Sequence, residues 1–450
     1  MKLKTLTLSN FRGFTSFECH FNEGLNVIVG QNGFGKTSVL DAISVAYGQY
    51  LSAFGTGVDR GVHKDEIHLA VTQSAHGETI QMEYQFPVTV TCEAYEASSI
   101  PDFPLSWTRS LNSEKSRTTQ VAPLKNSAKR LEKAVQNGEA ITLPILAYYG
   151  TGRLWKQKSL SSMKEESLSK ASRLEGYRDC MDPESSYNAF ARWLRNESIA
   201  DYERRMEILE QSGLEEALSK GKTARGRLLS AIGNAINTVL APSGWKNVRY
   251  GASSKQIIAT HPKQGDMPIS LLSDGVRNMV GLVADIAYRC VRLNPHLEGN
   301  AVTGTFGTVL IDEIDMHLHP EWQQLALQNL EEAFPNIQFI VTTHSPQVLS
   351  TVKKESIIAM NKTGAVQPIF GETYGEASND ILTEVMHVNP KPRIEQVVDI
   401  EHYLDMIDLG QHESSEGKAL RAKLEETLGP DHHELQKADR KIRRKGLLAQ

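Results

Sequence analysis

The chain has 450 residues, which is enough for two or three domain-sized units with a large core. Hydrophobic residues make up 40% of it and charged residues 23%, and no apolar run approaches the roughly 18 residues that a membrane-spanning helix needs. The four cysteines are scattered without a C-x-x-C pair, which argues against a disulfide framework and a zinc site. The net charge of −5 implies that any contact with nucleic acid comes from a local basic patch.

The first segment of the chain predicts two strands joined by a turn. Apolar and polar residues alternate over 3–10 and again over 17–21, on either side of Asn10-Phe11-Arg12-Gly13-Phe14. The two phenylalanines fit core packing, whereas Arg12 is a candidate nucleotide contact because a phosphate-binding motif follows it in the sequence. Since the sequence starts without a signal-peptide pattern, we expect a cytoplasmic protein.

The stretch Gly30-Gln31-Asn32-Gly33-Phe34-Gly35-Lys36-Thr37 fits the P-loop pattern G-x-x-x-x-G-K-[ST]. An apolar strand pattern precedes it at 24–29 and an apolar helix pattern follows at 38–46, so a chance glycine turn is the weaker interpretation. The glycines let the backbone wrap a phosphate chain at the start of a helix, whose dipole favours anions. We expect Lys36 to reach the β and γ phosphates of ATP and Thr37 to hold Mg²⁺. The candidate nucleotide contacts here are Gly30, Asn32, Gly33, Gly35, Lys36, Thr37 and Ser38.

The middle of the chain changes from strand patterns to helix patterns. Residues 66–110 are expected to form antiparallel strands, and the apolar run 143–149 predicts a buried strand. That strand delivers residues 150–153 to the end where parallel sheets place ligands. Residues 154–240 are expected to be mostly helical, without a heptad pattern long enough for a long coiled coil. Residues 151–260 hold 18 Lys and Arg against 13 Asp and Glu, which fits either a surface that faces a polyanion or a solvated helical face.

A polar turn, Leu272-Ser273-Asp274-Gly275, opens a helix with an apolar face. The Ser273 hydroxyl and the Gly275 N–H at a helix N-terminus make a second candidate anion site. The turn alone is weak support, because many helices begin in this way.

An apolar strand at 306–311 runs directly into Asp312 and Glu313. Two acidic residues at the end of a buried strand are unfavourable unless they have a task. In phosphoryl transfer, Asp312 would bind Mg²⁺ through water, and Glu313 would orient and deprotonate the attacking water.

A further strand at 337–342 ends in Thr343-His344-Ser345-Pro346. A lone histidine is usually structural, but this strand follows the acidic strand by one helix. In a doubly wound sheet, His344 would therefore lie beside the γ-phosphate site. The pair His317 and His319 suggests a metal site, but a spacing of two does not place both on one helix face, so we do not expect a metal there.

Four elements therefore stand in a fixed order: the P-loop, the turn at 272–275, Asp312-Glu313 with Asp315, and His344. In this order they resemble the heads of ABC-type ATPases of the SMC, RecF and OLD-like group, as do the motifs at 10–14 and 312–320. The resemblance implies an α/β fold: a P-loop ABC-ATPase head with a mixed, mainly parallel sheet and an antiparallel N-terminal lobe. A helical insertion and a short helical C-terminal region would complete it.

The resemblance implies a role for each residue of the hydrolytic site. Lys36 and Thr37 would bind ATP and Mg²⁺, and Asp312 would be the second residue at the metal. Glu313 would be the catalytic base, and His344 would be the switch histidine.

The same resemblance implies pairing of two copies. Ser273 and Gly275 would form a signature that reaches the γ-phosphate held by a second subunit, so a homodimer or higher homo-oligomer is implied, and Arg12 would contact phosphate. Two departures matter: Val276 stands where members often have Gln or Glu, and residues 148–153 hold the place of a Q-loop glutamine. Hydrolysis could therefore be slow, or ATP could act mainly as a conformational switch.

The C-terminal part of the chain narrows the resemblance. Residues 374–382 are followed by helix patterns at 394–407 and 417–428 and by a basic run at 439–445. This layout is similar to the ATPase subunits of anti-phage defence systems, such as the Septu ATPase PtuA and its retron-associated relatives. It implies a separate HNH-type nuclease as partner, and DNA contact through the complex. The basic run equally fits a solvated helix end favoured by the helix dipole.

We expect four segments: an N-terminal ATPase lobe with the P-loop and antiparallel strands at 1–150, a helical insertion at 151–264, a C-terminal ATPase lobe at 265–372, and a helical region for partner or oligomer contacts at 373–450. The favoured function is an ATP-gated regulator of a nuclease, and the alternative is a RecF-like repair ATPase that binds DNA itself. The insertion of some 235 residues between P-loop and signature disfavours a transporter subunit. The missing coiled coil excludes SMC-type cohesion, and Asp405 and Asp408 have the wrong spacing for the Asp-x-Asp pair of an OLD-type nuclease.

Overall fold

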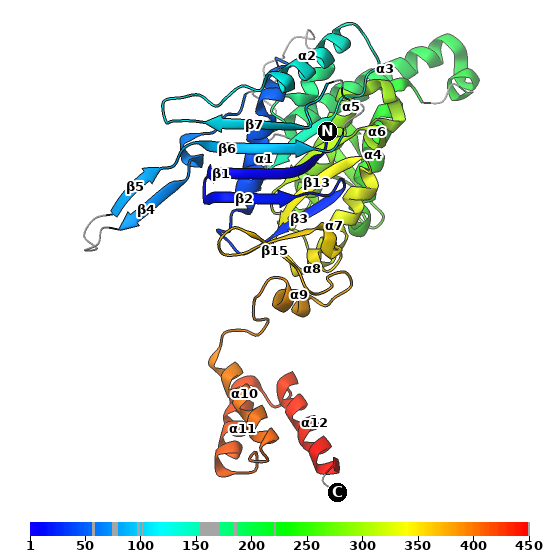
Figure 1. The fold of residues 1–450 in the computed structure, drawn as a ribbon. Coiled ribbons are helices and arrows are strands. Elements are labelled where there is room, and N and C mark those ends of the chain that lie inside the picture. Colours follow the sequence, from blue (N-terminus) through cyan, green and yellow to red (C-terminus); the bar gives the residue numbers. More distant parts are fainter. Residues whose placement is uncertain are drawn as a thin grey trace. The chain divides into compact units, whose positions relative to one another are not determined.

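A computed structural model of the chain describes residues 1–55, 59–73, 80–96, 100, 102–153, 172–182, 187–219 and 222–448. Residues 1–386 form one unit and residues 387–450 form a second, and each has its own apolar core (Figure 1). Within the described residues, no helix combines the length and the apolar character that crossing a membrane requires.

The first unit is built on a six-stranded sheet in the order β15-β14-β3-β13-β12-β8. Neighbouring strands are parallel, except that β15 runs antiparallel to β14. Strands β3, β8, β12 and β13 are buried along their whole length, which explains why their sequences are apolar without alternation. The strands span Leu25–Val29 (β3), Ile145–Tyr149 (β8), Gly307–Ile311 (β12), Ile337–Thr343 (β13), Ile357–Met360 (β14) and Val366–Gln367 (β15).

The register of this sheet brings the carboxyl ends of its central strands to one edge. Val29 lies opposite Thr343, and Ile311 lies opposite both Val341 and Tyr149. The loops that follow these strands therefore leave the sheet side by side, at the edge where parallel sheets bind ligands.

Strands from the first part of the chain form a second sheet. It is antiparallel in the order β2-β1-β6-β7, and helix α1 contacts both this sheet and strand β13 (Figure 1). A separate hairpin, β4 with β5, extends from it. These elements span Leu3–Phe11 (β1), Phe14–His20 (β2), Lys36–Ser52 (α1), Leu69–Gln73 (β4), Ile80–Tyr84 (β5), Val88–Ala94 (β6) and Ser106–Leu111 (β7).

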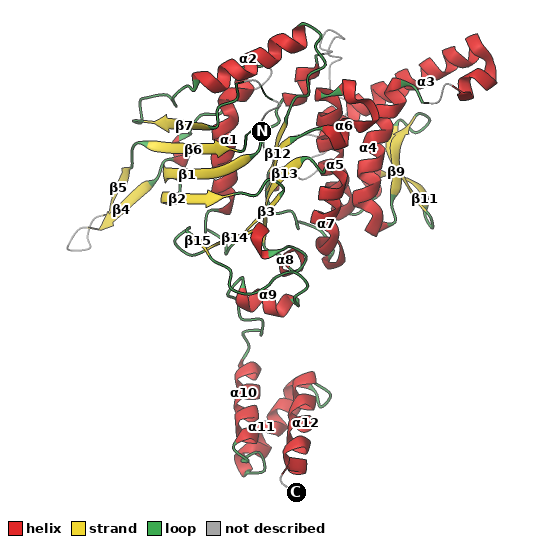
Figure 2. Cartoon of the chain, turned by 45° about the vertical axis from the view of Figure 1, so that its right-hand side comes forward, coloured by secondary structure: helices red, strands yellow, loops and turns green. Residues whose placement is uncertain are grey.

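Helices cover the six-stranded sheet on the side away from α1, as Figure 2 shows for α4, α5 and α7. The segment between β8 and α5 contains α3 and α4 and also a three-stranded antiparallel sheet, β9 to β11, which the helical expectation for this segment did not include. The remaining elements are Ala122–Gln136 (α2), Tyr187–Ser219 (α3), Ala224–Leu240 (α4), Lys246–Gly251 (β9), Gln256–His261 (β10), Gly265–Pro268 (β11), Asp274–Leu293 (α5), Ala301–Gly304 (α6), Pro320–Ala333 (α7), Pro346–Leu349 (α8) and Ser378–Glu384 (α9).

The second unit consists of three helices, Glu395–Asp408 (α10), Ser415–Leu428 (α11) and His433–Leu448 (α12). Its core contains Ile400, Tyr403, Ile407, Leu424, Leu435 and Ala438. Arg421 joins two of its helices through ion pairs with Glu425 and Asp439.

The predicted fold class is confirmed. The chain has a mixed α/β fold with a parallel-rich sheet, an antiparallel N-terminal sheet and C-terminal helices.

Candidate active site

The loop after β3 has the backbone conformation that a phosphate-binding loop needs. Gly33 and Gly35 have φ angles of 83° and 92°, in the left-handed region that glycine adopts without strain. A Cβ atom on Gly35 would also collide with the ring of Phe14, so the aromatic turn between β1 and β2 packs directly against the loop. The loop residues Asn32 and Gly33 are exposed, Ser38 is half-buried, and Gly30 packs beside the backbone of Met360.

Lys36 is the first residue of α1, and its side chain folds back over the loop. Its Nζ donates hydrogen bonds to the carbonyl oxygens of Gly30, at 2.8 Å, and Gln31, at 3.1 Å. Burial lowers the pKa of this ammonium group, and the acidic side chains across the sheet edge, Asp312 first among them, act in the opposite direction. The loop carbonyls are the groups that a bound phosphate chain would replace as partners of Lys36.

Thr37 and Asp312 are brought into direct contact although 275 residues separate them. The Thr37 hydroxyl donates to Oδ2 of Asp312 at 2.9 Å, and the Thr342 hydroxyl donates to Oδ1 at 2.6 Å. Asp312 is 3% exposed, so its carboxylate is held between two hydroxyl groups in a nearly dry position. A hydroxyl and a carboxylate at this spacing are hard oxygen donors of the kind that Mg²⁺ uses beside substrate phosphates.

Glu313 has a constrained backbone at the same edge. Its φ angle is 48°, an uncommon conformation for a residue other than glycine. The N–H of Glu313 donates to the Thr342 hydroxyl at 2.8 Å, and the N–H of Ile314 donates to the Thr342 carbonyl at 3.0 Å. Thr342 therefore fixes the turn that carries both acidic residues.

His344 follows β13 and is half-buried beside this cluster. Burial lowers the pKa of its imidazole, and the positive charge of Lys36 lowers it further, while Asp315 and the two neighbouring acids oppose the shift. The Thr343 hydroxyl next to it donates to Asp315 at 2.6 Å. The charges of Lys36, Asp312 and Glu313 therefore act directly on His344.

The Ser-Asp-Gly turn starts α5. Ser273 is its exposed N-cap residue, whereas Gly275 is buried against the segment that follows Glu313. A Cβ atom on Gly275 would lie 2.5 Å from the carbonyl oxygen of His317, so only glycine fits there without movement. The start of α5 is therefore packed on the segment that follows the acidic turn, and Ser273 is exposed there.

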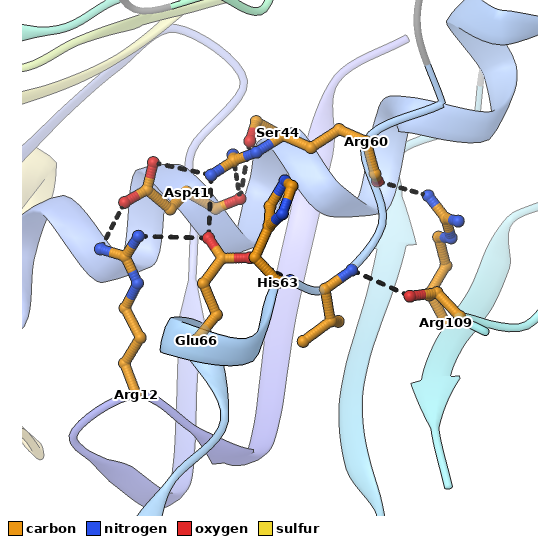
Figure 3. Close-up of polar contacts among 9 residues, drawn as sticks. Arg12, Asp41, Ser44, Arg60, His63, Glu66 and Arg109 are labelled. Atoms are coloured by element: carbon orange, nitrogen blue, oxygen red, sulfur yellow. Dashed lines mark hydrogen bonds and ion pairs between the residues drawn. The ribbon is translucent and has the colours of Figure 1, made fainter. Parts of the chain in front are cut away.

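Arg12 is held in a network of four charged side chains (Figure 3). Its guanidinium pairs with Asp41 at 2.6 Å and with Glu66 at 3.1 Å, and Arg60 bridges the same two carboxylates at 3.3 and 2.8 Å. The Glu66 side chain is 1% exposed and also accepts the N–H of His63 at 3.0 Å. The two carboxylates contact both terminal nitrogens of Arg12 and so fix the position of its guanidinium.

The sequence argument missed two kinds of residue. Thr342 could have been found, because a threonine at the end of the strand beside the acidic strand is well placed to meet Asp312. Asp41, Arg60 and Glu66 carry no comparable signal, since only the fold brings them to Arg12. Within the described residues, no group of three His, Cys, Asp or Glu side chains is arranged to hold a metal, and His317 and His319 are both exposed.

Comparison with known proteins finds similarity to ATPases. A family model described as an AAA domain matches residues 5–220, and one described as an AAA ATPase domain matches residues 155–349. The retron Vc95 probable ATPase of Vibrio cholerae serotype O1 biovar El Tor is 28% identical over 459 residues, which cover 94% of this chain and 86% of the relative. The Septu protein PtuA of Bacillus thuringiensis is 22% identical, with 80% of this chain and 75% of the relative covered. Among solved structures, an SMC head bound to the C-winged helix domain of ScpA matches with a TM-score of 0.47 and 15% identity, covering 82% of this chain and 96% of that one.

Proposed function

We infer from its kinship with the retron and Septu ATPases that this chain binds and hydrolyses ATP. We further propose that two copies pair around ATP and that the assembly controls a separate HNH-type nuclease in anti-phage defence. The observation that carries the proposal is the contact of Thr37 and Asp312 beside Lys36, because it joins the two halves of a phosphate and Mg²⁺ site.

The chain supplies every group that binding needs. The loop N–H groups and Lys36 would hold the phosphates, and Thr37 and Asp312 would hold Mg²⁺. Bound Mg²⁺ would supply positive charge at the phosphate oxygens. Asp312 is preorganised for this role because both of its oxygens already accept hydrogen bonds from hydroxyl groups.

Glu313 is the proposed general base. Its carboxylate would accept the proton of the attacking water, and the fixed turn at Thr342 would keep that carboxylate in position. His344, held neutral near pH 7 by its lowered pKa, would orient the water by hydrogen bonding rather than by charge.

The exposed Ser273 supports the pairing proposal. Its hydroxyl is at the N-terminus of a 20-residue helix and has no cap hydrogen bond with its own helix. A helix start with an exposed serine, followed by the buried Gly275, is suited to bind the γ-phosphate held by a second copy.

Two variants test this function. Lys36→Ala should abolish ATP binding in calorimetry, because it removes the one cation inside the loop. Glu313→Gln should bind ATP normally but hydrolyse it at least about a hundredfold more slowly, so that an ATP-bound dimer accumulates in light scattering. Wild-type turnover in Glu313→Gln would refute the assignment of the base, and a monomer under all conditions would refute pairing.

A further inference from the structure

Three buried polar side chains form a cluster between the end of strand β8 and helix α5. Tyr149, Asp285 and Arg289 are 3%, 3% and 4% exposed. The Tyr149 hydroxyl donates to Oδ2 of Asp285 at 2.7 Å, and Nε of Arg289 donates to the same oxygen at 2.7 Å. One carboxylate oxygen therefore joins a strand of the central sheet to the helix that starts at Ser273.

The cluster reaches a third part of the chain through the other end of Arg289. Its Nη1 donates to the carbonyl oxygens of Gly176, at 2.9 Å, and Arg178, at 3.0 Å. The cluster therefore joins α5, strand β8 and the segment at 176–178, while Oδ1 of Asp285 has no hydrogen-bond partner among the described residues.

The cluster connects to the candidate active site in two places, through strand β8 and through the start of α5. The carbonyl oxygen of Tyr149 accepts the N–H of Asp312 at 2.8 Å, next to the position where a Q-loop glutamine was missing from the sequence. At its N-terminus, α5 also contacts the segment that follows the acidic turn, since Gly275 is packed against the carbonyl of His317. A displacement of Asp312 would thus be transmitted to α5 through Tyr149 and Asp285.

Stability alone does not explain such a cluster. Apolar side chains of similar volume usually stabilise a core as well as a buried ion pair does. Asp285 and Arg289 are both in α5 and stay paired when the helix moves. Rotation or sliding of α5 against β8 would instead break the hydrogen bond from Tyr149 and leave a buried hydroxyl without its acceptor. The cluster therefore opposes motion of the strand against the helix.

We propose that Tyr149, Asp285 and Arg289 are positioning residues that couple the ATP site to the Ser273 end of α5, and so determine how strongly ATP binding promotes pairing with a second copy. This inference rests on the proposed function. It predicts that weakening the cluster weakens ATP-dependent pairing and leaves the affinity for ATP nearly unchanged.

Tyr149→Phe in the full chain is the direct test, because it removes one oxygen atom and keeps the ring. In the Glu313→Gln background, we expect the affinity of the monomer for ATP to stay within about twofold, measured by calorimetry at low protein concentration. The dissociation constant of the ATP-bound dimer, measured by analytical ultracentrifugation, should rise at least tenfold. With Glu313 intact, kcat should fall while KM stays nearly constant.

Tyr177→Phe is the matched control. Tyr177 is also fully buried, but its hydroxyl donates to the carbonyl of Pro144, at 2.7 Å, and not to α5. Tyr177→Phe should lower the melting temperature without changing the dimer dissociation constant. Equal losses of pairing in the two variants, or unchanged pairing in Tyr149→Phe, would overturn the proposal.

A triple variant separates positioning from stability. Tyr149→Phe with Asp285→Leu and Arg289→Met replaces the whole cluster by apolar side chains and removes both buried charges together, so the melting temperature should recover towards the wild-type value. If the cluster positions α5, pairing should stay weak despite that recovery, whereas recovery of both would make the cluster merely structural. Should Tyr149→Phe fail to fold, Arg289→Lys gives the same readouts. Failure of the proposed function would be distinct, because the wild-type chain itself would then not pair with ATP.

Discussion

At the scale of single residues, the Thr342 hydroxyl links the Asp312 side chain to the backbone of Glu313. It donates to Asp312 and accepts the N–H of Glu313. We predict that Thr342→Val, which is nearly isosteric, lowers kcat for ATP hydrolysis by about ten- to a hundredfold, the range found when supporting groups around a metal ligand are removed. Steady-state kinetics with purified protein measures this.

Thr308→Val is the control for that change. Thr308 is an equally buried threonine near the other end of the sheet, where its hydroxyl donates to the Met1 carbonyl at 3.0 Å. Thr308→Val should lower the free energy of unfolding and leave kcat unchanged. If both variants lose kcat in parallel, Thr342 acts through overall stability and not through the acidic turn.

His344 leads to a prediction about pH. Its pKa lies below the ordinary 6.5 because burial and the Lys36 charge disfavour the imidazolium form. A group with a lowered pKa gains its proton only at lower pH, so kcat/KM should hold constant from about pH 8 down to pH 6.5 and fall only below that. His344→Gln should remove that acidic fall. A fall centred above pH 7 in the wild type would contradict this placement of the histidine.

At the scale of elements, the network of Arg12, Asp41, Arg60 and Glu66 joins the turn after β1 to α1 and to the segment before β4. Glu66 is its most buried member. Glu66→Gln takes away a charge that two guanidinium groups share, and should cost about 2 kcal/mol of unfolding free energy in urea titration. Glu114→Gln, which removes one partner of the exposed Lys64 pair, should have no measurable effect.

If Glu66→Gln were as stable as the wild type, the network would hold Arg12 without contributing to the fold. The same variant also tests the phosphate role expected for Arg12. Release from Glu66 would leave the guanidinium freer to move, so ATP affinity should rise or stay constant. A fall in affinity would mean that Glu66 holds Arg12 in its binding position.

The sequence predicted well those elements whose important residues are close together both in the sequence and in the structure. The P-loop joins one strand to the following helix, and Asp312 directly follows an apolar strand, so spacing alone was informative. The contact of Tyr149 with Asp285 spans 136 residues, and no local pattern encodes it. The sheet of β9 to β11 was missed because its strands are short and largely polar, in a segment between two helical regions.

At the scale of the whole molecule, the candidate site draws on segments from nearly the full length of the first unit. The P-loop, the α5 start, the acidic turn and His344 are assembled only when residues 1–386 fold together. The second unit has a core of its own, in which Leu424 and Ile407 are fully buried. Changes in the second unit can therefore be tested against an ATP site that lies in the first.

We predict that a chain ending at Met386 binds ATP with an affinity within about threefold of the full chain, because the P-loop contacts lie inside the first unit. If the nuclease binds within the helical region expected to make partner or oligomer contacts, the shortened chain should no longer capture an HNH-type nuclease encoded beside its gene. Co-expression with affinity purification measures the capture, and calorimetry measures the ATP affinity.

Leu424→Ala in the full chain tests whether capture of the nuclease depends on the fold of the second unit or only on the presence of its residues. The substitution should cost about 3 kcal/mol within a small three-helix core and so unfold the second unit, while the melting transition of the first unit stays in place. If the packed helices form the contact surface, capture should be lost in Leu424→Ala as in the shortened chain. Capture by both changed chains would instead put the nuclease contact on residues 1–386, where it could respond to ATP directly.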